Sequence, residues 1–273
     1  MKKIFLFALL AAVLIGCGND DDDNSTTSPV NYKISFNSPD VIKNGTEHSI
    51  IPVIEPNADE ISSIELFLDG KSMEKKFSAP FSFKFTLTDL PTGEHKLIMA
   101  ATMKNGSVIN SDEKTFLFAV NLGDEYQGGI VIKILDNGVH GTIASKSDLT
   151  GGVLGKYKYG AYNGNYQAYS MDDGLENTNK FRGKPDSNYA AIACINLEHN
   201  GYNDWYLPAY NEMLLFVNFL AKLNIPERSG RVYWSSTGDN SNSQRAYAVP
   251  FGVSFGTPCD IQGSYLVRPC RRF

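Results

Sequence analysis

Apolar and polar residues alternate in short runs through the first half of the chain. Alternation with a period of two puts successive side chains on opposite faces of a strand, so that one face is buried and one meets water. Turn sequences separate the runs at 69–70, 91–93 and 105–106. Strands are therefore predicted at 32–36, 64–68, 81–85, 97–103 and 116–118. The expected fold over residues 30–121 is an all-β Ig-like sandwich.

The pattern changes after residue 123. Residues 128–135 and 138–145 are predicted to form two paired strands, and apolar residues then recur at helical spacing in 187–198 and 209–223. Pro208 suits the start of the second helix, because the N–H that proline lacks has no intrahelical partner there. Further strands are predicted at 233–237, 246–255 and 264–271. Residues 123–273 are therefore predicted to form an α+β domain.

Both tryptophans of the chain flank the helix predicted at 209–223. Trp205 precedes the helix, and Trp234 lies in the strand that follows it. A buried indole needs an acceptor for its N–H group. The acceptors beside them in the sequence are Asn203, Asp204, Ser235, Ser236 and Thr237. This stretch is predicted to be the nucleus of the second domain.

The N-terminus carries a targeting pattern. Two lysines precede an apolar run at 4–15 that is too short to span a bilayer as a stable helix. Residues 14–17 read LIGC, which resembles a lipobox. The resemblance implies a lipoprotein signal peptide at 1–16 and acylation of Cys17. An ordinary signal peptide with a coincidental cysteine is the alternative.

Residues 17–29 are predicted to form an acylated, acidic tether. The four consecutive aspartates at 20–23 repel one another and stay solvated, which argues against a calcium site there. Their place after the cysteine resembles the export tag of Bacteroidota surface lipoproteins. That resemblance implies an outer-membrane, lipid-anchored protein facing the cell exterior, with a periplasmic location as the alternative.

Composition and missing motifs narrow the function. The chain has 273 residues, enough for two ordinary domains, and a net charge of -5, which argues against nucleic acid as a partner and limits membrane contact to the lipid anchor. Hydrolase, zinc-protease and nucleotide-binding motifs are missing, and the four histidines are not spaced for a metal. No enzyme, metal or cofactor is predicted. Calcium at a turn formed by Asp172, Asp173 and Glu176 is the alternative to an ordinary acidic turn.

Five ordered motifs lie in the second domain. Their residues are Gly201, Asp204, Trp205, Leu207, Pro208, Glu212, Tyr233, Trp234, Ser235, Ser236, Thr237, Ala246, Tyr247, Val249, Val267, Arg268 and Arg271. This series resembles the C-terminal domain of the Legionella collagen-like adhesin family, which is similar to the Fibrobacter major paralogous domain. The resemblance implies a C-type-lectin-like α+β fold, a surface setting and binding of glycan or matrix, with no catalytic residue. The fold signature comprises Trp205, Pro208, Glu212, Trp234 and Arg268.

Three cysteines follow Cys17, namely Cys194, Cys259 and Cys270. An exported setting favours their oxidation. The family resemblance implies a helix-to-strand disulfide, here Cys194–Cys270. Cys270 is displaced by one residue from the family's position, which turns it to the other strand face, so a Cys259–Cys270 pair stays open.

The first domain also carries a resemblance. The sequences at 67–70 (FLDG), 79–81 (APF) and 91–95 (PTGEH) resemble bacterial Ig-like domains. The expected role is a spacer that holds the second domain away from the membrane. His48 and His95 are expected on solvated strand edges.

Two loops of the second domain supply the candidate ligand contacts. The stretch 156–170 carries five tyrosines among Gly and Asn, and aromatic faces of this kind stack on sugar rings. The alternative is that these tyrosines pack over the core. The polar loop at 238–244 is the second surface, because binding residues concentrate on loops. The weak candidates are Tyr162, Tyr166, Asp239, Asn240, Asn242 and Gln244.

Three arginines near the C-terminus leave two interpretations open. Arg268, Arg271 and Arg272 either form an anion site or pair with carboxylates such as Glu212 inside the domain. The predicted function is a lipid-anchored surface protein for adhesion or glycan capture, with a glycan or a matrix or surface protein as partner. The alternatives are an accessory subunit of a surface complex and a carboxylate-based glycan hydrolase.

Overall fold

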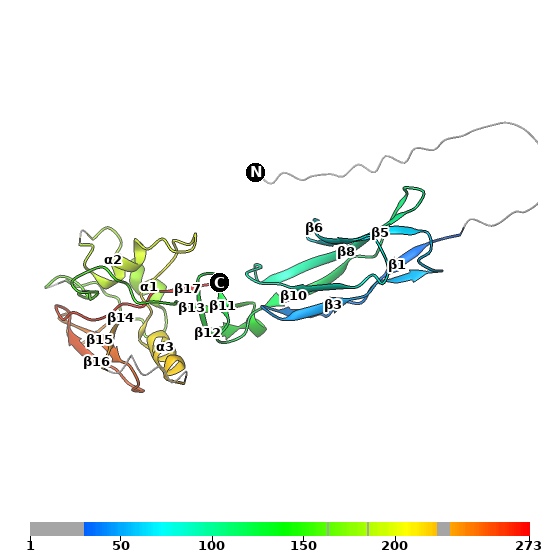
Figure 1. Ribbon diagram of the computed structural model, residues 1–273. Coiled ribbons are helices and arrows are strands. Elements are labelled where there is room, and N and C mark those ends of the chain that lie inside the picture. Colours follow the sequence, from blue (N-terminus) through cyan, green and yellow to red (C-terminus); the bar gives the residue numbers. More distant parts are fainter. Residues whose placement is uncertain (1–29, 163, 185, 223–229) are drawn as a thin grey trace, which may run out of the picture.

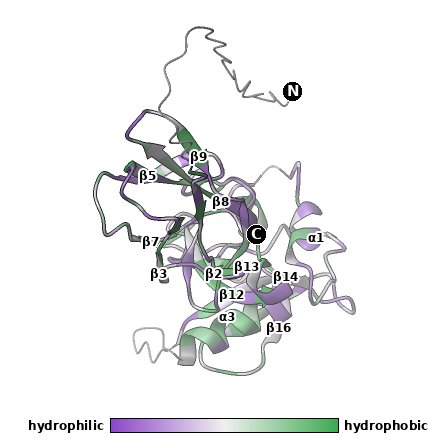
Figure 2. Cartoon of the chain, turned by 90° about the vertical axis from the view of Figure 1, so that its right-hand side faces the viewer, coloured by the Kyte–Doolittle hydropathy of each residue, from purple (hydrophilic) through white to green (hydrophobic). Residues whose placement is uncertain are grey.

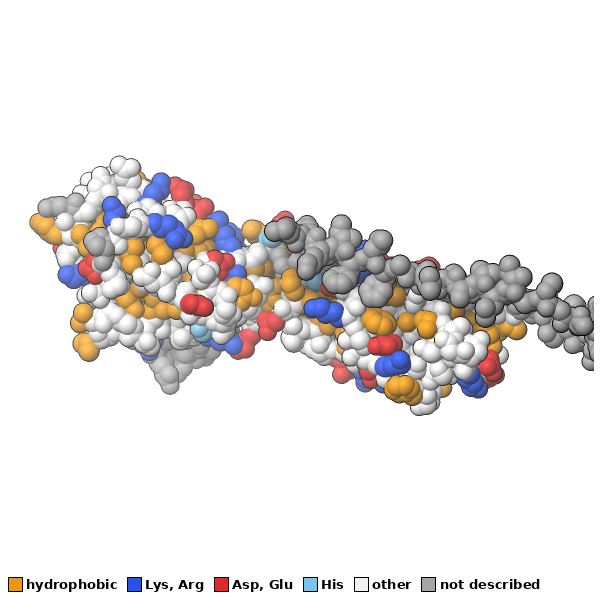
Figure 3. Space-filling view, turned by 90° about the horizontal axis from the view of Figure 1, so that it is seen from above, with side chains coloured by type: hydrophobic (Ala, Val, Ile, Leu, Met, Phe, Trp, Pro, Cys, Tyr) orange, Lys and Arg blue, Asp and Glu red, His pale blue; other side chains and the backbone are white. Residues whose placement is uncertain are grey.

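The computed structural model describes residues 30–162, 164–184, 186–222 and 230–273. The predicted signal peptide, Cys17 and the tether lie outside these residues. The described elements form two regions arranged end to end, with a narrow waist between them (Figure 1, Figure 3). No helix within the described ranges is long and apolar enough to cross a membrane.

The N-terminal region is a β-sandwich. Its strands are β1 (Lys33–Ser35), β2 (Val41–Lys43), β3 (Glu47–Ile50), β4 (Val53–Glu55), β5 (Ile61–Leu68), β6 (Lys71–Lys76), β7 (Phe83–Thr86), β8 (Gly93–Met103), β9 (Val108–Asn110) and β10 (Lys114–Ala119). The larger sheet has the order β2-β10-β8-β5-β6, with β9 also paired to β8. The pairs β1–β4 and β3–β7 are antiparallel.

Burial in the sandwich follows the predicted alternation. In β8, Leu97, Met99, Ala101 and Met103 are buried, and the residues between them are more exposed. They share one core with apolar residues of the neighbouring strands, among them Ile64, Leu66, Phe83, Phe116 and Phe118. Burial of each large apolar side chain contributes roughly 1.5–3 kcal/mol. This continuous core is what holds the predicted strands together.

His95 is buried, which corrects the prediction that it is solvated. Its Nδ1 lies 2.6 Å from Oδ2 of Asp69, and its Nε2 lies 2.7 Å from the carbonyl oxygen of Pro91. The ring also lies beside Phe116 and Phe118. His48 is partly buried, and its Nε2 has no hydrogen-bond partner in the described structure. Period-two alternation places a residue on a strand face, but it does not show that a neighbouring turn covers that face.

Within its described residues, the C-terminal region combines two small sheets with three α-helices and one short 3-10 helix. Its elements are β11 (Glu125–Tyr126), β12 (Gly129–Leu135), η1 (Asp136–Gly138), β13 (His140–Ser145), α1 (Gly174–Asn179), α2 (Ala190–Ile195), α3 (Tyr210–Lys222), β14 (Val232–Gly238), β15 (Arg245–Pro250), β16 (Thr257–Asp260) and β17 (Cys270–Arg272). The sheet orders are β11-β12-β13-β17 and β14-β15-β16. The last strand therefore closes the sheet that begins the region.

Several element boundaries differ from the prediction, and the strand predicted at 264–271 is reduced to β17, Cys270–Arg272. The helix α2 is shorter than 187–198, because Asp186 accepts a hydrogen bond from the N–H of Asn188 and holds a turn before the helix. Residues 251–256 turn the chain, with Gly252 at a φ of +80°, instead of extending the strand. The chain then returns as β16 beside β15, in a segment predicted to be a loop.

The helix α3 packs through the predicted face. Met213, Phe216, Val217 and Leu220 are buried against both sheets, whereas Leu215 is exposed. Figure 2 shows hydrophobic stretches along α3 beside β12 and β14. The predicted helix end near residue 224 lies outside the described residues.

Both tryptophans are buried, but the predicted neighbours do not accept their N–H groups. Nε1 of Trp234 donates to the carbonyl oxygen of Tyr157, 2.7 Å away and 77 residues distant in the sequence. Nε1 of Trp205 has no acceptor among the described residues. Proximity in the sequence was therefore the wrong guide to these hydrogen bonds.

The junction between the two regions is a packed interface. Tyr126, Val131 and Ile143 belong to the same buried cluster as the core of the sandwich. Hydrogen bonds cross the waist from the N–H of Val120 to the carbonyl oxygen of Gly138 (2.9 Å), and from the hydroxyl of Tyr126 to the carbonyl oxygen of Leu90 (2.9 Å). The apolar core thus continues from the sandwich into β12 and β13.

Candidate functional site

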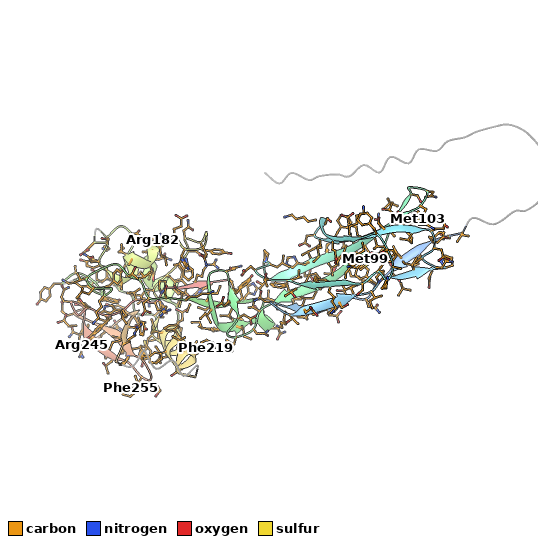
Figure 4. The ribbon with its side chains drawn as sticks, in the orientation of Figure 1. Met99, Met103, Arg182, Phe219, Arg245 and Phe255 are labelled. Carbon is orange, nitrogen blue, oxygen red and sulfur yellow. The ribbon has the colours of Figure 1, made fainter. Side chains whose placement is uncertain are left out.

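The two predicted ligand loops meet at a shallow depression. It is lined by Tyr159, Asn165, Tyr166 and Tyr169 from the tyrosine-rich stretch, and by Asp239, Ser243 and Arg245 from the second loop and β15. Figure 4 places Arg245 at the end of the molecule far from Met103 in the sandwich. Of the candidate ligand contacts, the structure brings Tyr166 and Asp239 together in this lining, whereas Tyr162, Asn240, Asn242 and Gln244 are not part of it. We call this feature the loop depression.

The loop depression is small. A water-sized sphere has about 10 Å³ of space there, which is about the room that one buried water needs. A sugar ring does not fit inside it. Any saccharide at this place has to lie across the rim, where aromatic faces and amide groups are accessible.

Asp239 holds the second loop in shape. Its Oδ1 accepts hydrogen bonds from the N–H of Ser241 (2.9 Å) and from the hydroxyl of Ser241 (2.6 Å). These bonds lower the pKa of the Asp239 carboxyl. Asn240 and Asn242 are exposed at the tip, and Gln244 is partly buried. Asp239 therefore supports the loop, while the two asparagines face solvent.

The two candidate tyrosines have different surroundings. The ring of Tyr166 stacks on Phe181 at a centroid distance of 4.2 Å, and its hydroxyl accepts a hydrogen bond from the N–H of Ala161 (2.6 Å). Tyr162 is 70% exposed. Tyr166 is thus a packing residue with an accessible edge, as the alternative interpretation of the stretch proposed. Tyr162 is the tyrosine available to a ligand.

This difference gives a stability prediction. Tyr166→Ala removes a stacked ring and is expected to lower the free energy of unfolding by ~2 kcal/mol. Tyr162→Ala removes an exposed ring and is expected to change it by less than about 0.5 kcal/mol. Denaturant unfolding of both variants measures the difference. Equal effects of the two substitutions would contradict the packing role of Tyr166.

Glu212, a residue of the fold signature, caps two helices. Its Oε2 accepts from the backbone N–H groups of Gly174 (3.0 Å) and Ala209 (2.9 Å), and its Oε1 accepts from the hydroxyl of Tyr206 (2.9 Å). These N–H groups stand at the N-termini of α1 and α3, where backbone donors lack intrahelical acceptors. Pro208 is buried one residue before Ala209. Burial raises the pKa of the Glu212 carboxyl.

The three arginines form ion pairs with aspartates inside the region, and the charge of Arg272 also acts on Glu212. Nε of Arg268 donates to Asp148 (2.7 Å), and Nε of Arg271 donates to Asp204 (2.8 Å). Nη2 of Arg272 donates to Asp173 (2.8 Å). Arg268 is 2% exposed, and its guanidinium lies 5.1 Å from the centroid of the Phe216 ring. These guanidinium groups are engaged in holding the fold, which leaves the anion-site interpretation without support.

The acidic turn before α1 is a helix cap. Oδ1 of Asp173 accepts from the N–H of Glu176 (2.8 Å), and Oδ1 of Asp172 accepts from the side-chain amide of Asn211 (2.7 Å). The described residues contain no group of three or more His, Cys, Asp or Glu side chains placed to hold a metal. The turn therefore has a structural role, because it caps the N-terminus of α1.

The predicted Cys194–Cys270 disulfide is not formed in the structure. Cys194, Cys259 and Cys270 are free. Cys194 packs with Trp234 and Tyr157, whereas Cys270 packs in a separate cluster with Tyr206 and Met213. The two side chains belong to different buried apolar clusters, and no bond joins their sulfur atoms.

Alkylation checks the state of these thiols. Burial raises the pKa of Cys194 and of Cys270, and only the thiolate reacts. In native protein, iodoacetamide is expected to label Cys259, which is partly exposed, and to label Cys194 and Cys270 only after denaturation. Peptide mass spectrometry without reductant shows whether each cysteine is alkylated, free or disulfide-bonded. A disulfide-linked pair of peptides containing Cys194 and Cys270 would contradict the structure.

The structure has a second feature that the sequence-based prediction did not include. Two cavities of about 200 Å³ and 180 Å³ adjoin a tight hairpin at residues 153–156. The signal was present as an apolar pair, Val153 and Leu154, directly before a glycine. In a turn such residues are unusual, because turns favour Asn, Asp and Gly.

Comparison with known proteins bears on the N-terminal sandwich. Residues 34–98 match a family model described as a bacterial Ig domain. The fibronectin(III)-like modules of Clostridium thermocellum CbhA share 19% identity over 31% of this chain and 93% of that one, with a TM-score of 0.28. The extracellular domain of mouse leukocyte-associated immunoglobulin-like receptor 1, solved as a strand-swapped dimer, shares 20% identity over 30% of this chain and 85% of that one, with a TM-score of 0.23. No curated protein matches the chain. The N-terminal sandwich contains a bacterial Ig-like domain.

Proposed function

We propose that the protein is a lipid-anchored binding protein of the outer membrane that faces the cell exterior. In this proposal the Ig-like sandwich is a stalk, and the C-terminal region is a C-type-lectin-like head that captures glycans. The chain enters the sandwich at β1, at the end opposite to α2 and β16 (Figure 1). An anchor before residue 30 would therefore place the head farthest from the membrane.

The observation that carries this proposal is the rim of the loop depression. Asn165 lines the depression and is exposed, and the two loops that meet there also carry an exposed tyrosine, Tyr162, and the exposed amides of Asn240 and Asn242, which lie outside the lining itself. Aromatic faces and amides are the groups that bind sugar rings and sugar hydroxyls. A shallow rim of this kind binds weakly, so dense display on a surface would supply avidity.

The hydrolase alternative has no supporting observation. Glycosidases need two carboxyl groups on either side of the bond they cleave. Each of the three cavities described in the head has at most one carboxylate in its lining. Exposed large hydrophobic residues occur in both regions, such as Phe77 in the stalk and Leu154, Tyr162 and Phe255 in the head. No specific observation therefore favours a subunit of a surface complex over a glycan receptor.

A glycan array screened with the purified full-length protein tests the proposal. The full chain is needed because removal of the sandwich would expose Tyr126 and Val131 at the waist. Selective binding that Tyr162→Ala abolishes, with folding intact, is the expected result. Repetition with EDTA tests whether calcium takes part. A blank array with folded protein contradicts glycan capture, and pull-downs from the cell surface then test the accessory-subunit alternative.

A further inference from the structure

The hairpin at residues 153–156 has a turn sequence that does not match its backbone. The N–H of Val153 donates to the carbonyl oxygen of Lys156 (2.9 Å). The N–H of Lys156 donates to the carbonyl oxygen of Val153 (3.1 Å). The two central residues, Leu154 and Gly155, have φ values of +56° and +73°. Two-residue hairpins with positive φ at both central positions favour Asn-Gly. This chain has leucine at the first of them.

Folding does not account for the residues at the tip. Leu154 is 95% exposed and Val153 is 67% exposed, so neither gains much from burial. Leucine in the left-handed region is strained by its Cβ. The turn requires this backbone angle but it does not require leucine, and strained residues cluster at ligand sites. The tip therefore points to a contact outside the chain.

The cavities beside the hairpin adjoin each other. Val153, Lys158, Asp186 and Asn188 line the first cavity, and Arg231 and Tyr265 line the second. Lys156 and Ser264 line both. Each cavity alone is smaller than a typical small-ligand site, which begins at about 300 Å³, but the two together exceed that volume. We call the pair the hairpin groove.

The hairpin groove carries an excess of positive charge. Lys156 makes no ion pair with any described residue, and Nζ of Lys158 donates to a neutral group, Oε1 of Gln262 (2.9 Å). Arg231 pairs with Asp148 (2.7 Å). The one carboxylate in the two linings is Asp186, which accepts from the N–H of Asn188. An anionic ligand matches this balance of charge.

We propose that the hairpin groove binds an acidic saccharide, in which the carboxylate of a uronic acid faces Lys156. Ser264 and Asn188 supply hydrogen bonds for sugar hydroxyls, and Val153 and Leu154 supply an apolar edge for the C–H face of the ring. This inference rests on the proposed glycan capture. It adds a class of ligand and a second place on the head, apart from the loop depression.

Calorimetric titration of the full-length protein with uronate oligosaccharides tests the inference. The probes are oligogalacturonate, oligoglucuronate and alginate fragments, with a neutral galactan oligomer of equal length for comparison. At least one acidic oligomer is expected to bind and the neutral one is not. Lys156→Gln is expected to weaken binding about ten-fold or more, because it removes a charge-assisted hydrogen bond. Lys71→Gln, which removes the same charge from an exposed position on β6, is expected to leave binding unchanged.

Leu154→Asn separates a ligand role from a folding role. It creates the favoured Asn-Gly turn, so the melting temperature is expected to rise by ~3 °C while affinity for the acidic oligomer falls. Three results would overturn the inference: no acidic oligomer binds, Lys156→Gln binds as the parent does, or a polyglutamate peptide competes equally. The proposed glycan capture is tested separately by the glycan array. If binding on that array depends on Tyr162, glycan capture is supported even when the hairpin groove binds no acidic saccharide.

Discussion

Glu212→Ala is expected to unfold the protein under conditions in which the parent protein stays folded. The carboxylate is 5% exposed and accepts three hydrogen bonds, two of them from the N-termini of different helices. Its removal leaves the N–H groups of Gly174 and Ala209 and the hydroxyl of Tyr206 without an acceptor. Each unsatisfied buried donor costs roughly 1–3 kcal/mol, so the free energy of unfolding is expected to fall by ~4 kcal/mol. Denaturant unfolding followed by tryptophan fluorescence measures it, because Trp205 and Trp234 both lie in the C-terminal region.

Glu212→Gln is the matched control. Its carbonyl oxygen can accept from both backbone N–H groups, and its amide can donate to the Tyr206 oxygen, as a protonated carboxyl would. The expected loss is less than about 1.5 kcal/mol. If the glutamine variant is as unstable as the alanine variant, hydrogen-bond acceptance is not the role of this residue.

Comparison of the parent protein with Glu212→Gln also predicts how stability depends on pH. Burial raises the pKa of Glu212 above its ordinary value of 4.5. Between that value and the pKa in the folded protein, the folded chain holds a proton that the unfolded chain has lost. The contribution of this group to stability is therefore complete below about pH 4.5 and declines as the pH rises through that window. The stability of the parent relative to Glu212→Gln is expected to fall over the same interval.

The strands and the long helix could be predicted from local pattern, because burial repeats at a period set by the backbone. The alternation in β5, β8 and β10 and the apolar face of α3 needed no knowledge of the partner strand. The loop at 238–244 exposes Asn240 and Asn242, whereas the stretch 156–170 buries Tyr157, Tyr159 and Ala168 in the core, which matches the packing alternative more than the surface interpretation.

The partners of the buried polar groups could not be predicted in this way. Arg268 pairs with Asp148, 120 residues away, and Arg271 pairs with Asp204, 67 residues away. A pattern assigns such a residue to a face, but the partner depends on how two distant segments come together. The same reason explains the wrong acceptor for Trp234 and the wrong environment for His95. Leu154 was overlooked for a different reason, since its unusual feature is a local backbone angle that the residue type does not favour.

Gly138→Ala is expected to uncouple the two regions. Gly138 has a φ of +95°, and a Cβ there would overlap the carbonyl oxygen of Val120, the last residue of the sandwich core. The strain and the clash together are expected to cost ~3 kcal/mol. The hydrogen bond from the N–H of Val120 and the bond from the Thr92 hydroxyl to Val139 lie at the same place and are expected to be lost.

Calorimetry measures this uncoupling as the number of unfolding transitions, and limited proteolysis measures it as cleavage between the two regions. Because one core spans the waist in the parent protein, it is expected to unfold in a single transition, whereas Gly138→Ala should show two and become sensitive to cleavage near residues 120–140. Gly106→Ala is the matched control, since Gly106 has a similar φ of +85° but no atom within 4 Å of the added Cβ. It carries the backbone strain without the clash and is expected to keep one transition. Two transitions in the parent protein would show that the stalk and the head unfold independently, and the distance between the head and the anchor would then not be fixed by the packing at the waist.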